Sequence, residues 1–165
     1  MIEVPKTEAF FETRAKDALL FTYDIYMDAV RLQRYVPSPR EPRVLRLANY
    51  RLAFPKYNPQ LGSGLASVMR SIGDEVWGIG WRCNAPELKA FEKKLGMPHR
   101  YHTINVHLSD RGIDRLSGWS YMISVPDSVE SKPTKAIKFE IINAGKLHGL
   151  PDEYLVQLAS QPTLD

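Results

Sequence analysis

The sequence predicts an α+β fold in which a small mixed β-sheet or barrel is flanked by helices. Two observations predict it: strand-like segments outnumber helical ones, and the helical segments gather in the middle and at the end of the chain instead of alternating with strands. The length of 165 residues predicts one domain spanning residues 1–165. A composition that is 44% hydrophobic and 25% charged indicates a globular chain able to form a core.

The expected strands are short apolar or alternating segments bounded by turn residues. They cover residues 19–23, 43–54, 65–70, 75–82, 102–108 and 118–125. The stretch 57–64 contains Asn, Pro and Gly and predicts a turn between the second and third strands.

The expected helices cover residues 7–16, 28–35, 84–96, 135–147 and the segment that begins at 151. The third of these has the strongest start signal, because Asn84 can cap the helix while Glu87, three residues later, completes a capping box. Leu88, Phe91 and Leu95 follow at helical spacing. They predict one apolar face that points inward.

Composition and patterning argue against several classes of function. The net charge of +3 is scattered without a basic stripe, so nucleic-acid binding is not expected. No apolar run reaches the length of a membrane span, and the first residues lack the apolar core of a signal peptide. The single cysteine, Cys83, suggests a reducing, cytoplasmic setting. His99 and His102 have no metal-ligand spacing, so a metal site is not expected. Gly62-Ser63-Gly64 is too short for a nucleotide-binding fingerprint, and no other cofactor is expected.

Four stretches of the chain carry a resemblance to a known family. They are Ala48–Phe54, then Gly64–Ser67 with Gly73–Gly78, then Pro86–Gly96 followed by Tyr101, and finally Lys132–Thr134 with Gly149–Tyr154. In this order and spacing the chain resembles the gamma-glutamylcyclotransferase-like family. The resemblance implies an enzyme without a cofactor that acts on a small molecule, as a monomer or homodimer.

Two departures from the family pattern affect its active site. The family's Tyr-Gly-Ser-Asn substrate loop reads Tyr23-Asp24-Ile25-Tyr26-Met27 here. The family's general acid/base glutamate is matched by Leu95, which can neither accept nor donate a proton. Without glycine at the second loop position, close approach of a ligand to the backbone becomes harder. We therefore expect a more apolar cavity than the family site.

The expected substrate-binding residues combine the altered loop, the leucine and two tyrosines that match tyrosines bordering the family pocket. They are Tyr23, Ile25, Tyr26, Met27, Leu95, Tyr101 and Tyr121. A tyrosine hydroxyl in such a cavity can donate a hydrogen bond to a substrate oxygen. The alternative for each tyrosine is core packing with a satisfied hydroxyl.

Two carboxylates are candidates for the missing catalytic base. Asp24 follows a buried strand at the position of the family's substrate loop, where burial would raise its pKa toward the range of a working base. Its alternative role is that of a turn aspartate. Glu92 lies about one helical turn before Leu95 and could reach the cavity edge. Its alternative role is a solvated glutamate near lysines such as Lys89.

Three functions follow from this pattern. The first is a divergent enzyme that cyclises, isomerises or eliminates from a small, rather apolar molecule by proton transfer, in a pathway of specialised-metabolite biosynthesis. The second is a non-catalytic relative that binds a ligand or a protein. The third is a retained gamma-glutamyl cyclotransferase that forms 5-oxoproline with a substitute carboxylate.

Overall fold

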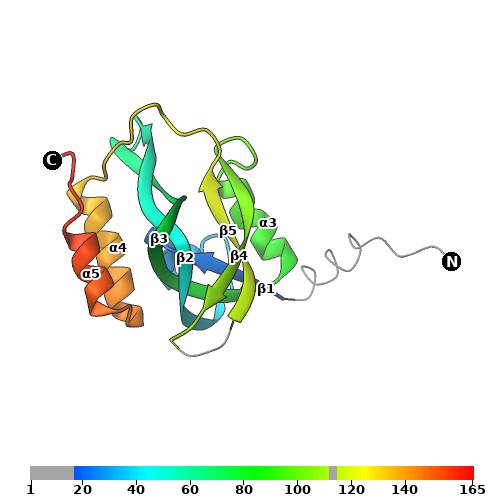
Figure 1. Ribbon diagram of the computed structural model, residues 1–165. Helices are drawn as coiled ribbons and strands as arrows, with labels where there is room; N and C mark the ends of the chain where they lie inside the picture. Colours follow the sequence, from blue (N-terminus) through cyan, green and yellow to red (C-terminus); the bar gives the residue numbers. More distant parts are fainter. Residues whose placement is uncertain (1–16, 112–114) are drawn as a thin grey trace.

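A computed structural model describes residues 17–111 and 115–165 of the chain. The helix expected over residues 7–16 lies outside the described residues. Five strands form the centre of the molecule, and short helices pack around them (Figure 1).

The strands close into a barrel in the order β1-β3-β2-β4-β5. Their bounds are β1 Ala18–Thr22, β2 Arg40–Asn58, β3 Ser63–Cys83, β4 Tyr101–Ser109 and β5 Arg115–Ile123. Neighbouring strands pair antiparallel except β1 and β5, which run parallel and pair at Leu20 and Trp119. The mixed barrel with flanking helices confirms the predicted fold class.

The two strands expected over residues 65–70 and 75–82 are one continuous strand, β3. The glycine that suggests a break, Gly73, has a φ of +90° and lies opposite a register shift in β2, where Asn49 also has a positive φ. The amide of Gly73 donates a hydrogen bond of 3.1 Å to the side-chain oxygen of Asn49. The local signal therefore marks a bulge, which bends a strand without ending it.

The helical elements are η1 Ile25–Met27, α2 Ala29–Leu32, α3 Ala85–Lys94, α4 Lys135–His148 and α5 Asp152–Ala159. The predicted capping box at the start of α3 is present: the side chain of Asn84 accepts from the amide of Glu87, whose carboxylate accepts from the amide of Asn84. Leu88, Phe91 and Leu95 are buried, as their spacing predicts. Helices α4 and α5 lie side by side on one flank of the barrel, and α3 lies on the other (Figure 1).

Gly78 allows β1 to approach β3 closely. A Cβ at this position would lie 2.2 Å from the carbonyl oxygen of Thr22 and 2.8 Å from the ring of Phe21. Backbone contact at that distance cannot be relieved by a side-chain rotation, so only glycine fits here. The end of β1, which leads directly into the loop at Asp24, is set by this contact.

We expect Gly78→Ala to lower the free energy of unfolding by about 3 kcal/mol or more, because overpacking against backbone forces the two strands apart. Urea unfolding monitored by tryptophan fluorescence measures the change. Gly73→Ala is the control, since its Cβ would meet nothing within 4 Å and costs only the positive φ, about 1 kcal/mol. Equal losses in the two variants would contradict the close-approach explanation.

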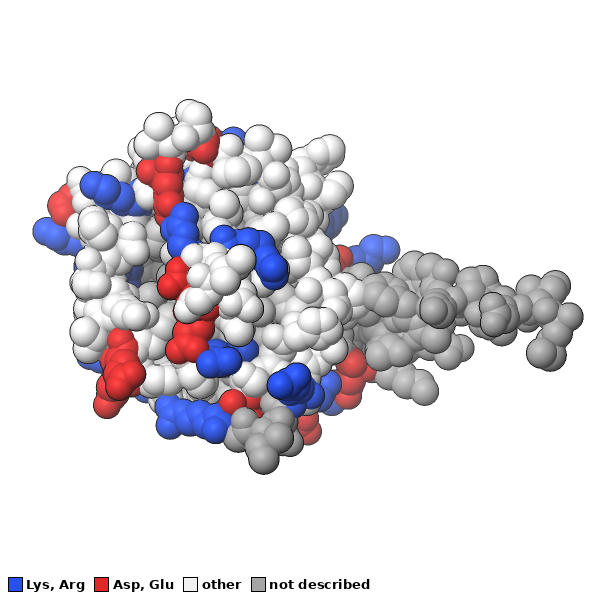
Figure 2. All heavy atoms as spheres, in the orientation of Figure 1, with Lys and Arg blue, Asp and Glu red and all other residues white. Residues whose placement is uncertain are grey.

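The described surface carries mixed charge. On the face shown in Figure 2, Lys and Arg side chains are interspersed with Asp and Glu among uncharged residues. Within residues 17–111 and 115–165, no helix is long and apolar enough to cross a membrane. The same residues contain no group of three His, Cys, Asp or Glu side chains that could hold a metal ion.

Candidate functional site

The loop after β1 is held in place by its own backbone and by the barrel beneath it. Asp24 is the N-cap of η1, and its Oδ1 accepts a hydrogen bond of 3.0 Å from the amide of Tyr26. Tyr23 is fully buried, donates its hydroxyl to the carbonyl of Tyr121 at 2.7 Å, and stacks on the Tyr121 ring with centroids 4.6 Å apart. Met27 is also fully buried. The loop is thus anchored on both sides of Asp24.

The carboxyl group of Asp24 is held in place through one of its oxygens. The hydroxyl of Tyr121 donates to Oδ1 at 2.7 Å, and the Tyr26 amide donates to the same atom. Asp24 lines the adjoining cavity while being almost fully buried. A carboxylate fixed by two donors at a cavity wall is placed to act as a general base on a ligand that comes within hydrogen-bond reach.

Burial sets the proton affinity of this carboxyl group. Loss of solvation raises the pKa of Asp24 to about 6, against an opposing effect of the hydrogen bonds from Tyr121 and the Tyr26 amide. Burial, and then the nearby Asp24 charge, raise the pKa values of Tyr26, Tyr101 and Tyr121 above their ordinary range. At neutral pH the site therefore combines an ionised carboxylate with protonated tyrosines.

A cavity of about 370 Å³ opens beside Asp24. Its apolar lining includes Ile25, Leu65, Ala66 and Leu95. Leu95 is the C-cap residue of α3, is buried, and lines this cavity. The cavity is within the size range of small-molecule sites.

The predicted site residues divide into two groups. Asp24, Ile25, Tyr26, Leu95 and Tyr101 line the cavity together. The hydroxyl of Tyr101 donates to the carbonyl of Ala66 at 2.8 Å, so its ring is held against the wall of the cavity.

Three predicted substrate-binding residues do not line the cavity; they support it from below. Tyr23, Met27 and Tyr121 are fully buried in the barrel core. Tyr121 contacts two residues that line the cavity. Its hydroxyl donates to Asp24, and its ring packs edge-on against Tyr101, with centroids 5.9 Å apart. These buried residues support the cavity wall from the barrel core, and a ligand in the cavity would not contact them directly.

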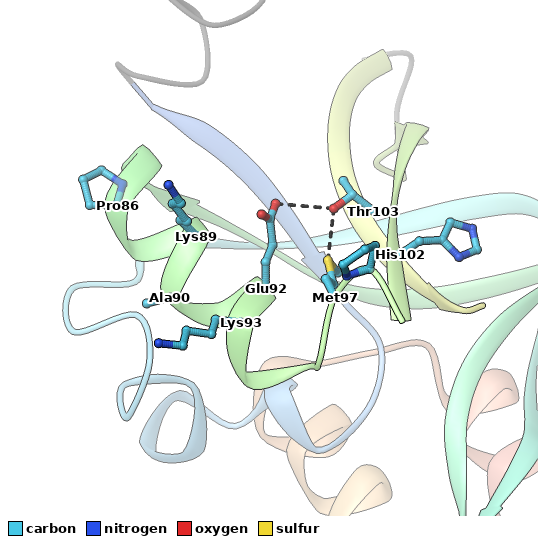
Figure 3. Close-up of a pocket in the computed structure, with 9 residues that line it drawn as sticks. Pro86, Lys89, Ala90, Glu92, Lys93, Met97, His102 and Thr103 are labelled. Carbon is cyan, nitrogen blue, oxygen red and sulfur yellow. Dashed lines mark hydrogen bonds between the residues drawn. The ribbon is translucent and has the colours of Figure 1, made fainter. Parts of the chain in front are cut away.

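Glu92, the second candidate base, lies away from the Asp24 cavity. It lines a separate open groove of about 820 Å³ along α3, where it points toward Thr103 and Met97 (Figure 3). Its Oε1 lies 3.4 Å from the hydroxyl of Thr103. The cavity opens at the C-terminal end of α3, whereas Glu92 faces β4. Helical spacing alone did not distinguish these two directions, and the structure does not bring Glu92 together with Asp24.

The sequence did not predict the four cations that line the cavity. They are Arg31, Arg34, Lys94 and Arg100. Each is an ordinary scattered cation in the sequence, and they meet because α2, the end of α3 and the segment before β4 converge on one cavity. Asp24 is the single carboxylate in the lining described.

Known proteins with similar sequences and structures share one family name. The bovine gamma-glutamylcyclotransferase is 32% identical over 149 residues, covering 86% of this chain and 77% of the relative. The mouse gamma-glutamylcyclotransferase is 28% identical over 145 residues, covering 85% and 76%. A solved structure of a gamma-glutamyl cyclotransferase superposes with a TM-score of 0.84 at 26% identity, covering 91% of this chain and 90% of that one. No family model matches the sequence.

More distant structures share only the fold. A yeast gamma-glutamyl cyclotransferase specific to glutathione aligns with a TM-score of 0.61 at 10% identity, over 86% of this chain and 93% of that one. The sequence relatives extend over most of both chains, and the barrel agrees with the resemblance drawn from the motifs. The chain belongs to the gamma-glutamylcyclotransferase family of enzymes.

Proposed function

We propose that this chain is a cofactor-independent cyclotransferase-type enzyme in which Asp24 supplies the proton transfer that the family assigns to the residue at Leu95. The observation that carries the proposal is the buried Asp24 carboxyl group, which lines the cavity and whose Oδ1 is held by Tyr121 and the Tyr26 amide. Its pKa of about 6 suits a base that works near neutral pH.

The proposed reaction is an intramolecular acyl transfer with balanced protons. The ionised Asp24 takes a proton from the substrate ammonium, and the free amine attacks the side-chain amide carbonyl of the same molecule. A carbon–nitrogen bond forms and closes the ring. Asp24 gives its proton to the leaving amine, whose bond to the carbonyl carbon breaks. The regenerated Asp24 carboxylate then takes the second proton from the ring nitrogen and passes it to the departing amine, which leaves as an ammonium. Neither an oxidant nor an activated co-reactant is needed.

The apolar lining narrows the substrate class. Ile25, Leu65 and Leu95 present aliphatic surface next to the carboxylate. Burying a matching apolar group contributes about 25 cal/mol per Å². We therefore favour a substrate with a bulky, rather apolar portion, as in specialised-metabolite biosynthesis. In an isomerisation or an elimination, the other reactions within this proposal, Asp24 would take the proton from a carbon atom instead of from the ammonium.

A product screen tests this function. The purified protein is incubated with gamma-glutamyl amides of alanine, leucine, phenylalanine and tryptophan and with glutathione, and 5-oxoproline is measured by mass spectrometry. We expect product from the bulkier amides and a rate that rises with pH through about 6, because only the ionised Asp24 accepts a proton. A rate that falls as pH rises through this range would contradict Asp24 as the base.

A second function is favoured by one observation: the cavity is lined by Leu95, the residue that the motif resemblance matches to the family's glutamate. A non-catalytic relative would bind apolar gamma-glutamyl amides without turning them over. Isothermal titration calorimetry on the same panel separates the two functions. Tight binding with no product between about pH 5 and 9, a window spanning the Asp24 titration, would identify a binding protein.

A further inference from the structure

We propose that Arg34, Lys94 and Arg100 form an anion subsite at the mouth of the Asp24 cavity, which binds a carboxylate on the part of the substrate that projects outward. All three side chains line the cavity and are exposed, so a ligand can reach them. The subsite rests on the proposed function, because it lies in the same cavity as Asp24. It adds the chemical group that the outer end of the substrate carries.

Among the described residues, these three cations have no carboxylate partner in an ion pair. Arg31, the fourth cation of the cavity, is paired with Glu140 at 2.6 Å and is partly buried. None of the ion pairs found within residues 17–111 and 115–165 involves Arg34, Lys94 or Arg100. Three like charges gathered at one opening repel one another, and an anion bound between them relieves that repulsion.

The aromatic wall keeps the cations close to the cavity. The Lys94 ammonium lies 5.4 Å from the centre of the Tyr35 ring, a cation–π distance. The Tyr35 ring in turn packs edge-on against Tyr26, with centroids 6.3 Å apart. The positive charges of Arg34 and Arg100 act on the hydroxyls of Tyr26 and Tyr101, opposing in part the effect of burial on their pKa values. Arg34 and Arg100 line the same cavity as these two tyrosines.

The anionic and cationic residues of the cavity differ in depth, and this gives the ligand a direction. Asp24 is only 5% exposed, whereas Arg34, Lys94 and Arg100 are exposed. The carboxylate thus marks the inner end of the cavity and the cations its mouth. A ligand with a protonated amine at Asp24 and a carboxylate at its far end matches both regions, with an apolar body against Leu95 between them. Guanidinium groups favour carboxylates because two parallel hydrogen bonds fit the planar group.

Binding of hippurate, an unreactive probe, separates this proposal from catalysis. Hippurate has an apolar ring and a carboxylate but no free amine, and hippuramide differs from it by the loss of the charge. Isothermal titration calorimetry with the full chain should show hippurate binding about 10-fold more tightly than hippuramide, the effect of a charge-assisted contact. Arg34→Gln/Arg100→Gln should remove this preference without changing hippuramide binding.

The matched control is Lys89→Gln/Lys93→Gln, which removes two charges from the separate α3 groove and should keep the preference. Equal binding of hippurate and hippuramide to the wild type, absence of binding by both, or an undiminished preference in Arg34→Gln/Arg100→Gln would overturn the subsite. Tighter binding of phenyl phosphate than of hippurate would overturn the choice of carboxylate. Because no probe can be turned over, these outcomes are independent of whether Asp24 is a catalytic base.

Discussion

Asp24→Asn is expected to lower turnover about 100- to 10,000-fold, the usual contribution of a general base. Asparagine keeps an oxygen that can accept from the Tyr26 amide and from the Tyr121 hydroxyl, so the loop keeps both hydrogen bonds. What it loses is the ability to take a proton. The measurement is the rate of 5-oxoproline formation from the best gamma-glutamyl amide across pH 5 to 9, a range about the pKa of Asp24.

The same variant should be more stable than the wild type at neutral pH. The pKa of Asp24 is raised from 3.8 to about 6, so the folded state binds the proton more tightly than the unfolded state. The stability that protonated Asp24 contributes is present below pH 4 and is lost as pH rises through about 6. At pH 7 an ionised, buried Asp24 thus costs about 3 kcal/mol, which asparagine removes. Urea unfolding at pH 4 and pH 7 measures this gain.

Asp28→Asn is the matched control for Asp24→Asn. Asp28 is four residues further along the chain, caps α2 by accepting from the amide of Val30 at 3.0 Å, and does not line the cavity. Asparagine caps helices as well as aspartate does, so both activity and stability should stay near the wild-type values. Full turnover in Asp24→Asn, or an equal loss in both variants, would remove Asp24 from the role of base.

Leu95→Glu is expected to raise 5-oxoproline formation about 100-fold or more, because it returns a proton-transferring group to the position that the family uses. Leu95 is buried at the end of α3 and lines the same cavity as Asp24. The substitution has a cost in stability of about 2 to 4 kcal/mol, from the lost apolar contact and the buried acid. The initial rate with gamma-glutamyl amides and a urea unfolding curve measure the two effects.

Leu95→Gln is the control for Leu95→Glu. It has the same length and polarity but cannot exchange a proton, so its rate should stay at the wild-type level. A folded Leu95→Glu protein with no gain in rate would show that the altered loop at Asp24, Ile25 and Tyr26 prevents cyclotransfer, whatever stands at Leu95. The result therefore decides which of the two departures from the family pattern limits this reaction.

Local features were determined by the sequence itself. The capping box from Asn84 to Glu87 depends on residues three apart, and the burial of Leu88 and Phe91 follows from helical spacing, so both could be predicted without a fold. The motifs placed Leu95 and Asp24 at a common site, and the structure puts both in one cavity. Short-range hydrogen bonds and periodicity need no distant partner.

The tertiary structure alone decided the rest of the site. The hydroxyl that orients Asp24 comes from Tyr121, 97 residues away, across the parallel pairing of β1 and β5. Glu92 turned toward β4 because the strand lies beside that face of α3, a neighbour that helical spacing does not specify. Arg34 and Arg100, far apart in the sequence, line one cavity because the folded barrel brings their segments together. Contacts between segments far apart in the chain depend on how the strands pair, and that pairing is a property of the whole fold.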